Sequence, residues 1–198
     1  MIITINPDNP QGRLLKRVAD ILAQGGVIAY PTDTQYGLGC DLSQKKAIEK
    51  IYRLKQRSLK IPFSVICADL THISEYARVS NFAYRTLKRL LPGPFTFVLP
   101  GSRLMPQIML TKRLECGIRV PKHPIALGLI NALGRPLINT SARLPEQPYP
   151  NGALEVAEIF GGQLDAVVDG GPAPGQPSTV VSLIDDDPVI LRQGLGIF

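Results

Sequence analysis

The sequence predicts an α/β fold: one domain over residues 1–198, with a mixed sheet and flanking helices. Short apolar runs of strand length alternate along the chain with segments whose apolar residues recur at helical spacing. Such alternation is typical of α/β domains. With 198 residues, 44% of them hydrophobic, the chain can bury one substantial core, and no internal repeat, low-complexity tract or linker divides it.

The N-terminal part of the chain predicts two strands and two helices. Apolar residues between Leu14 and Leu22 share one helical face, and Gly25-Gly26 ends that helix. The strand that follows runs into the stretch YPTDTQYGLG at 30–39, which is expected to be a binding loop. The expected elements are a strand at 2–5, a helix around 14–22, a strand at 27–30, and a helix from Ser43 that delivers Lys55 and Arg57 at its C-terminal end.

The remainder of the chain continues the alternation, with a Pro-rich loop at 140–152. Strands are expected at 63–67, 95–99, 118–120, 137–139, 166–169, 178–184 and 189–193, and helices at 80–91, 124–133 and 153–160.

The composition favours anionic ligands. Lys and Arg number 22 against 16 Asp and Glu, giving a formal charge of +6 that attracts nucleotides, phosphates or RNA. Cys40, Cys67 and Cys116 lie far apart without metal-ligand spacing, so we expect reduced thiols in a cytoplasmic protein and no structural zinc. The N-terminus lacks a signal-peptide pattern and no eighteen apolar residues run together, so we expect neither export nor a membrane span.

Hydroxyl groups gather where the strand at 27–30 ends, a place where α/β folds commonly bind ligands. The hydroxyls of Thr32, Thr34 and Tyr36 can donate to carboxylate or phosphate oxygens. The alternative is a tight turn in which Thr32 or Asp33 caps the backbone. The number of polar residues in the loop favours a site.

Three cationic residues can each be interpreted either as ligand contacts or as structural residues. Lys55 and Arg57 can hold one phosphate or carbonate as a point charge and a bidentate fork, or they can complement a helix dipole and point into water. Arg119 interrupts an apolar strand, where it either contacts an anion or faces outward from an edge strand.

Further polar residues follow the later strands. Thr140 and Ser141 leave a strand as the first loop does, and Ser178 and Arg192 lie at the ends of the last two strands. His123 at a helix start is interpreted as structural. The acidic run 185–187 is explained better by a hairpin turn than by a metal site, and no phosphate-binding loop or nucleophile elbow is present.

Taken together, these segments resemble the YrdC/YciO family, whose best-known members are threonylcarbamoyl-AMP synthases. The resemblance implies a twisted, YrdC/RibB-like sheet with a large basic concave cavity, in the single-domain form without the C-terminal domain of longer relatives. It rests on blocks in one order over nearly the whole chain: YPTDTQYGLG, the KxR of Lys55 and Arg57, PGPFTFVL at 92–99, GIRVPKHPIA at 117–126, NTSA at 139–142, PSTVV at 177–181 and the closing ILRQG.

The resemblance also implies an activity and its site. The reaction forms threonylcarbamoyl-AMP and pyrophosphate from L-threonine, bicarbonate and ATP with Mg²⁺, and the product feeds the threonylcarbamoyladenosine modification of tRNA. No metal ligand from the chain is expected. The implied residues are Thr32, Thr34 and Tyr36 for threonine, Lys55 and Arg57 as the catalytic pair for bicarbonate and phosphate, and Arg119, Thr140, Ser141, Ser178 and Arg192 for the nucleotide.

Two departures from the synthase pattern make the chain more similar to the YciO branch. Arg143 stands where the synthases carry the asparagine of Ser-x-Asn, and the residues after Arg57 differ from the usual KxRPxxKPL. A guanidinium repels Mg²⁺ and can replace part of its charge. Double-stranded RNA binding is also attributed to the family, so the alternative is an RNA or nucleotide binding protein without efficient synthase activity.

Overall fold

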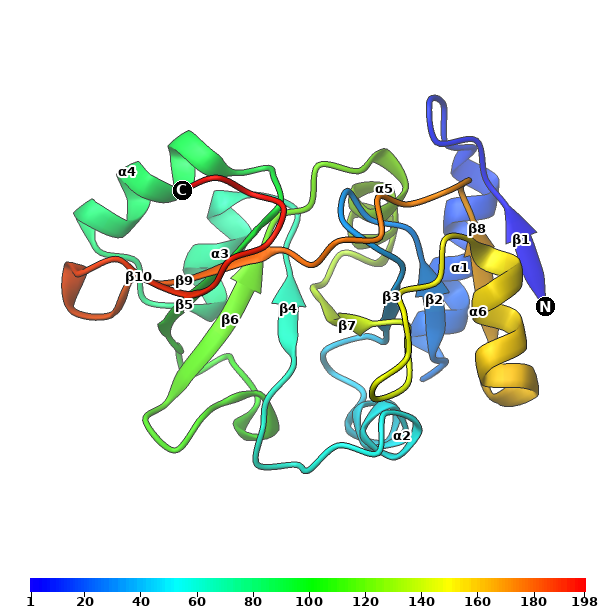
Figure 1. The fold of residues 1–198 in the computed structure, drawn as a ribbon, viewed down its shortest axis with the longest axis horizontal. Helices are drawn as coiled ribbons and strands as arrows, with labels where there is room; N and C mark the ends of the chain where they lie inside the picture. The colour runs from blue at the N-terminus through cyan, green and yellow to red at the C-terminus, as the bar shows by residue number, and fades with distance from the viewer.

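The computed structural model describes all residues from 1 to 198 as one ten-stranded mixed sheet with helices on both faces (Figure 1). The strand order across the sheet is β1-β8-β2-β3-β7-β4-β6-β5-β9-β10. The strands are β1 (Ile2–Thr4), β2 (Ile28–Tyr30), β3 (Gly37–Gly39), β4 (Ser64–Ile66), β5 (Phe95–Pro100), β6 (Glu115–Arg119), β7 (Leu137–Ser141), β8 (Ala166–Asp169), β9 (Thr179–Ser182) and β10 (Val189–Arg192).

Six α-helices flank the sheet, and short 3₁₀ turns occur at Gln107–Met109, Gly161–Gln163 and Ile184–Asp186. Side chains cap two of the helices: Asp69 accepts from the backbone N–H of His72, and Ser80 accepts from that of Ala83. The helices are α1 (Gly12–Ala23), α2 (Lys45–Leu54), α3 (Leu70–Tyr76), α4 (Asn81–Leu90), α5 (Pro124–Leu133) and α6 (Ala153–Phe160).

The chain visits the two halves of the sheet in turn. β1, β8, β2 and β3 form one half, and β4, β6, β5, β9 and β10 form the other, with β7 between β3 and β4. After β8, residues 170–178 cross from the first half to the second before β9 begins, as the orange segment in Figure 1 shows. This crossing brings the chain to the second half of the sheet, where β9 pairs with β5 and β10 is the outermost strand.

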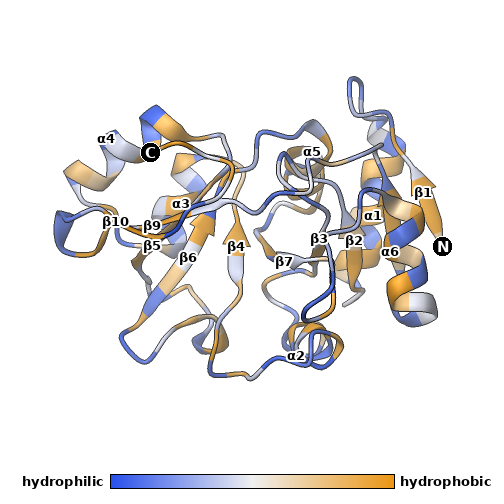
Figure 2. Ribbon diagram, viewed as in Figure 1, coloured by the Kyte–Doolittle hydropathy of each residue, from blue (hydrophilic) through white to orange (hydrophobic).

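The core is divided by the sheet into two clusters. The smaller cluster joins α1 and α5 to β1, β2 and β8 through residues such as Leu22, Ile28 and Leu129. The larger cluster lies mainly under α2, α3, α4 and α6. Figure 2 shows the corresponding pattern, with apolar strands and helices that are apolar on one side and polar on the other.

Most elements lie where the sequence predicts them. The bounds of α5, α6 and β8 match the predicted ranges, and the last two strands form the expected antiparallel hairpin. Helix α3 was not predicted, since its seven residues carry too short an apolar pattern. The predicted loop at 30–39 is also shorter than expected, because Gly37–Gly39 forms β3 and pairs with β2 and β7.

The two glycines of this loop sequence are required by Tyr30. The Tyr30 ring is fully buried and lies over Gly37 and Gly39. A Cβ atom on Gly39 would lie 2.6 Å from the carbonyl oxygen of Ile138 and 2.7 Å from the Tyr30 ring. Neither neighbour is a flexible chain end, so the sheet would have to shift to admit a methyl group.

Gly39→Ala is therefore expected to lower the free energy of unfolding by about 1–3 kcal/mol, the usual cost of overpacking a core. Denaturant unfolding monitored by circular dichroism measures the change. Gly12→Ala is the matched control, because nothing lies within 4 Å of its added methyl group. Equal stability of the two variants would contradict the packing argument.

The three cysteines are buried and none forms a disulfide.

None of the helices combines the length and the apolar character that crossing a bilayer requires.

Candidate active site

A cavity of about 470 Å³ lies over the central strands, at the junction of the two halves of the sheet. Its volume is within the range of about 300–1,000 Å³ that is usual for small-molecule sites. Small side chains form its floor: Ser64 on β4 lies opposite both Gly117 on β6 and Asn139 on β7. Short residues on adjacent strands leave room for a ligand to lie against the sheet.

Positive charge dominates the cavity wall. Arg57, Arg119, Arg143 and Arg192 line it, and Glu115 is the one carboxylate among the lining residues. Guanidinium groups bind carboxylates and phosphates through paired hydrogen bonds. The cavity is therefore suited to an anionic ligand, and the four cations come from two strands, β6 and β10, and two loops.

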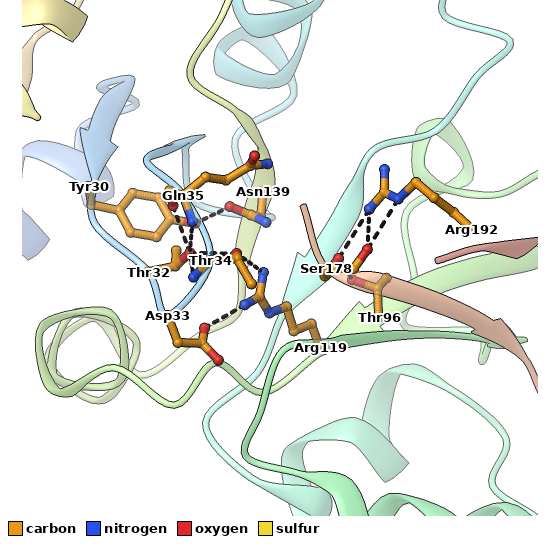
Figure 3. Close-up of polar contacts among 10 residues, drawn as sticks. All are labelled: Tyr30, Thr32, Asp33, Thr34, Gln35, Thr96, Arg119, Asn139, Ser178 and Arg192. Carbon is orange, nitrogen blue, oxygen red and sulfur yellow. Dashed lines mark hydrogen bonds and ion pairs between the residues drawn. The ribbon is translucent and has the colours of Figure 1, made fainter. Parts of the chain in front are cut away.

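Arg119 is held at the base of the cavity by the loop after β2 (Figure 3). Its guanidinium forms an ion pair with Asp33 and donates to Thr34 Oγ1 at 2.8 Å. The side chain is 3% exposed, and burial lowers its pKa while Asp33 opposes that shift. Arg119 lies on β6, between β4 and β5, so the edge-strand interpretation is wrong. The Nε atom of Arg119 and Oδ2 of Asp33 have no partner in the protein.

The three hydroxyl residues expected to bind threonine lie behind the cavity wall. The Thr32 hydroxyl donates to the carbonyl of Gln35 at 2.7 Å and accepts from the N–H groups of Thr34 and Gln35. The Tyr36 hydroxyl donates to the carbonyl of Gly171 at 2.7 Å, and burial raises its pKa to about 12. Thr32, Thr34 and Tyr36 are buried and are not among the residues that line this cavity, so their direct contact with threonine stays a prediction. The short hydroxyls instead satisfy the loop backbone and orient Arg119.

Lys55 is a support of the cavity rather than part of its lining. Its side chain is 8% exposed, and Nζ donates to the carbonyl of Ser141 at 2.8 Å, to Ser141 Oγ at 3.2 Å and to the carbonyl of Arg143. An ammonium has three N–H groups, so these bonds use all of them. Burial, followed by the charges of Arg143 and Arg57, lowers the pKa of Lys55 to about 8. This differs from the expected direct contact with bicarbonate or phosphate.

Arg57 and Arg143 line the cavity from two loops, one after α2 and one after β7. Arg57 lies over the ring of Phe63, with 5.1 Å from its Cζ to the ring centroid, and contacts the carbonyl of Pro62 at 3.4 Å. Arg143 donates to the carbonyl of Gln147 at 2.6 Å and stacks on Tyr149 at 4.2 Å. Stacking fixes the plane of a guanidinium while leaving N–H groups for a ligand.

Arg192 and Ser178 close the side of the cavity opposite the β2 loop, as Figure 3 shows. Arg192 donates to the Ser178 carbonyl at 2.8 Å and to Ser178 Oγ at 3.2 Å. Ser178 Oγ also lies 2.9 Å from the hydroxyl of Thr96. Of the ten predicted site residues, the cavity lining contains Arg57, Arg119, Thr140, Ser141, Ser178 and Arg192.

The donor set of the cavity does not fit a Mg²⁺ ion held by the chain. Such ions are usually bound through one or two carboxylates together with substrate phosphates. Here four arginines surround the single carboxylate of Glu115, and no three His, Cys, Asp or Glu side chains gather anywhere in the protein. The acidic run 185–187 lies exposed in the hairpin between β9 and β10.

Several lining residues were not predicted as site residues from the sequence. Gln35 lies in the loop after β2, between the predicted Thr34 and Tyr36. Asn139 lies on β7 next to the predicted Thr140, and strand alternation places it on the same side of β7 as Ser141. Thr96 and Tyr149 gave no usable signal, because a threonine in an apolar strand and a tyrosine in a Pro-rich loop are common. His123 does not line the cavity, and its Nδ1 atom has no partner.

A second hollow of about 550 Å³ lies beside α2 and α6. Its charged lining residues are Lys50 and Arg53, and the remainder are apolar or amide side chains and a glycine. Without convergent hydroxyls or buried charges, it offers less chemistry than the cavity over the central strands.

Comparison with known proteins gives the family. The profile of the Sua5/YciO/YrdC family, described as "Telomere recombination", matches residues 20–194. The chain belongs to this family. YciO of Escherichia coli K12, an uncharacterized protein, is 41% identical over 194 residues, which cover 97% of this chain and 94% of YciO. The crystal structure of E. coli YciO matches with a TM-score of 0.95 at 40% identity, covering 100% of this chain and 97% of that one.

Threonylcarbamoyl-AMP synthases are somewhat more distant members of the Sua5/YciO/YrdC family. The enzyme of Bacillus subtilis strain 168 is 38% identical over 195 residues, which are 96% of this chain and 55% of the synthase. P. abyssi Sua5, solved in complex with L-threonine, matches with a TM-score of 0.92 at 33% identity over 98% of this chain and 57% of Sua5. The family, its mixed α/β fold and the greater similarity to YciO are thus confirmed.

Proposed function

We propose that the chain joins L-threonine, bicarbonate and ATP into threonylcarbamoyl-AMP and pyrophosphate. The observation that carries this proposal is the convergence of four guanidinium groups, with serine, threonine and amide side chains, on one cavity of about 470 Å³. It is supported by the 38% identity to a threonylcarbamoyl-AMP synthase and by the likeness to a Sua5 structure that contains L-threonine. The product would serve threonylcarbamoyladenosine modification of tRNA.

The reaction has two steps that need no covalent bond to the protein. The threonine nitrogen, after losing a proton, attacks the carbon of bicarbonate, and water leaves to give a carbamate. A carbamate oxygen then attacks the α-phosphorus of ATP, and the bond to the bridging oxygen breaks as pyrophosphate departs. Both steps bring anions together, so positioning and fixed positive charge are the main requirements.

The cationic residues supply those requirements in this proposal. Arg57 and Arg143, whose planes are fixed by aromatic rings, would neutralise phosphate oxygens. Arg192 with Ser178 would contact the nucleotide from the opposite wall, and Arg119 would contact the carboxylate or carbamate through N–H groups left free by Asp33. Any Mg²⁺ that accompanies ATP would be held by the phosphates rather than by the chain.

The test is threonine-dependent release of pyrophosphate in the presence of ATP, bicarbonate and Mg²⁺. Arg57→Ala is expected to reduce that release about tenfold or more, because it removes charge stabilisation of about 1.4 kcal/mol or above. Arg53→Ala is the matched control, since Arg53 lies one turn earlier near the end of α2 and is exposed outside the cavity. Release that is the same with and without threonine would refute the proposal.

Binding of double-stranded RNA without turnover is the competing function, and the net charge of +6 is its support. It predicts affinity that falls steeply with salt and is unaffected by threonine or by filling the cavity with ATP. A cavity of single-nucleotide size favours the small-molecule reaction.

A further inference from the structure

Asn139 presents an amide to the cavity from the floor strand β7, and Tyr30 holds that amide from behind (Figure 3). Tyr30 is fully buried at the end of β2, and its hydroxyl donates to Asn139 Oδ1 at 2.8 Å. The two residues lie 109 positions apart in the chain, so the contact exists only because β3 brings β2 and β7 together.

This hydrogen bond fixes which end of the amide faces the cavity. Burial raises the pKa of Tyr30, so the phenol remains a donor. Asn139 Oδ1 is its one acceptor, and turning the amide over would leave the phenolic proton without a partner. Gly37 also contributes, because a Cβ atom there would collide with Asn139 Oδ1. The carbonyl end of the amide is therefore directed into the protein.

The opposite end of the amide is free. Asn139 Nδ2 has two N–H groups and no hydrogen-bond partner in the protein, although the residue lines the cavity. Unlike the four arginines of the lining, it is a neutral donor, and it lies on the floor of the cavity beside Ser64. A preoriented N–H group within a basic cavity is an arrangement that binds and stabilises oxyanions.

We propose that Asn139 donates to a negatively charged oxygen of the ligand, on a carboxylate or a phosphoryl group, and that Tyr30 is its positioning residue. This deepens the proposed function by adding a ligand contact on the floor of the same cavity, and it rests on that function for the identity of the anion. Neither residue is among those that the family resemblance implies for the site.

The test measures binding of two probes, inorganic pyrophosphate and L-threonine, by isothermal titration calorimetry. Asn139→Asp keeps the shape and the acceptor for Tyr30 but replaces the N–H donors with a carboxylate oxygen. It is expected to weaken binding of one probe about tenfold or more, and that probe identifies the group seated on Asn139. Asn131→Asp, the same change at an exposed position of α5, is the control and is expected to leave both affinities unchanged.

Tyr30→Phe separates positioning from packing. It keeps the buried ring and is expected to weaken binding of the same probe about threefold to tenfold, through a mobile Asn139 amide. In an Asn139→Ala background, Tyr30→Phe is expected to have no further effect, because Tyr30 acts only through the amide. Unfolding curves identify which variants are folded, and only those are titrated.

The outcomes are separable from those of the synthase assay. Wild-type affinity of Asn139→Asp for both probes would overturn the inference, as would an equal effect of Tyr30→Phe in both backgrounds. If Asn139→Asp loses affinity for a probe but the wild type shows no threonine-dependent pyrophosphate release, the inference stands and the proposed function fails. The reverse combination leaves the function standing without Asn139.

Discussion

Replacing Asp33 with alanine is expected to lower the free energy of unfolding by about 3–5 kcal/mol. Asp33 forms the one ion pair of Arg119, whose side chain is 3% exposed. Removing one partner of a buried pair leaves a charge that neither water nor protein compensates, and that is the costly case. Urea unfolding, with the midpoint and slope fitted separately, measures the loss.

Two comparisons show whether the loss comes from the pair. Asp33→Ala combined with Arg119→Met removes both charges and is expected to recover part of the stability, so the two changes are not additive. Asp185→Ala changes the same residue type in the exposed hairpin and should stay within about 0.5 kcal/mol of the wild type. A loss below about 1 kcal/mol for Asp33→Ala would mean that water already compensates Arg119.

The Asp33–Arg119 ion pair contributes both to the stability of the fold and to the shape of the candidate site. Arg119 lies in a central strand, where an unpaired cation would not be tolerated, and the loop after β2 supplies its carboxylate and a threonine hydroxyl. The same loop thereby fixes the direction of a guanidinium that lines the cavity. Stability and ligand binding depend on one contact between segments 86 residues apart.

The sequence predicts the elements of this fold well because their signals are local. Helix α5 begins at Pro124 and ends before Gly134, which adopts a left-handed conformation. Proline at a helix start and glycine after a helix end are both signals that the sequence alone provides. The short strand β3 was missed because Gly37–Gly39 has no strand propensity; it forms because two neighbouring strands and the Tyr30 ring require small residues there.

The candidate site was predictable at the level of loops but not of atoms. The polar segments that the sequence singles out after β2 and at the end of β7 both contribute to the cavity lining, through Gln35, Thr140 and Ser141. Which of them face the ligand depends on hydrogen bonds across the sheet: Thr32 and Tyr36 bond to their surroundings, whereas Gln35 and Asn139 reach the lining. No spacing rule contains that information.

Lys55→Met is the second change with a large expected effect, and it is expected to reduce threonine-dependent pyrophosphate release about 100-fold. The Lys55 ammonium ties three oxygens of Ser141 and Arg143, and an apolar side chain of similar length leaves them without donors. The loop that carries Arg143 would then shift, and a displacement of about 1 Å of a positioning group can cost that much. Steady-state pyrophosphate release measures the effect, with Lys46→Met, exposed on α2, as control.

The pH dependence of the wild type tests the same role independently. Since the pKa of Lys55 is lowered to about 8, release is expected to fall as pH rises through that value and one N–H donor is lost. Loss of stability does not explain this fall in release. The pKa of Lys55 is about 8 in the folded protein and 10.5 as its ordinary value, so between these two pH values the unfolded chain binds more protons than the folded one. The contribution of Lys55 to stability therefore rises with pH. The substrates also titrate in this pH range, but they do so equally in assays of the wild type and of Lys55→Met. Their effect therefore cancels when the release rate of the wild type is divided by that of Lys55→Met. A ratio that stays constant from pH 7 to 10 would show that Lys55 does not act through its charged form.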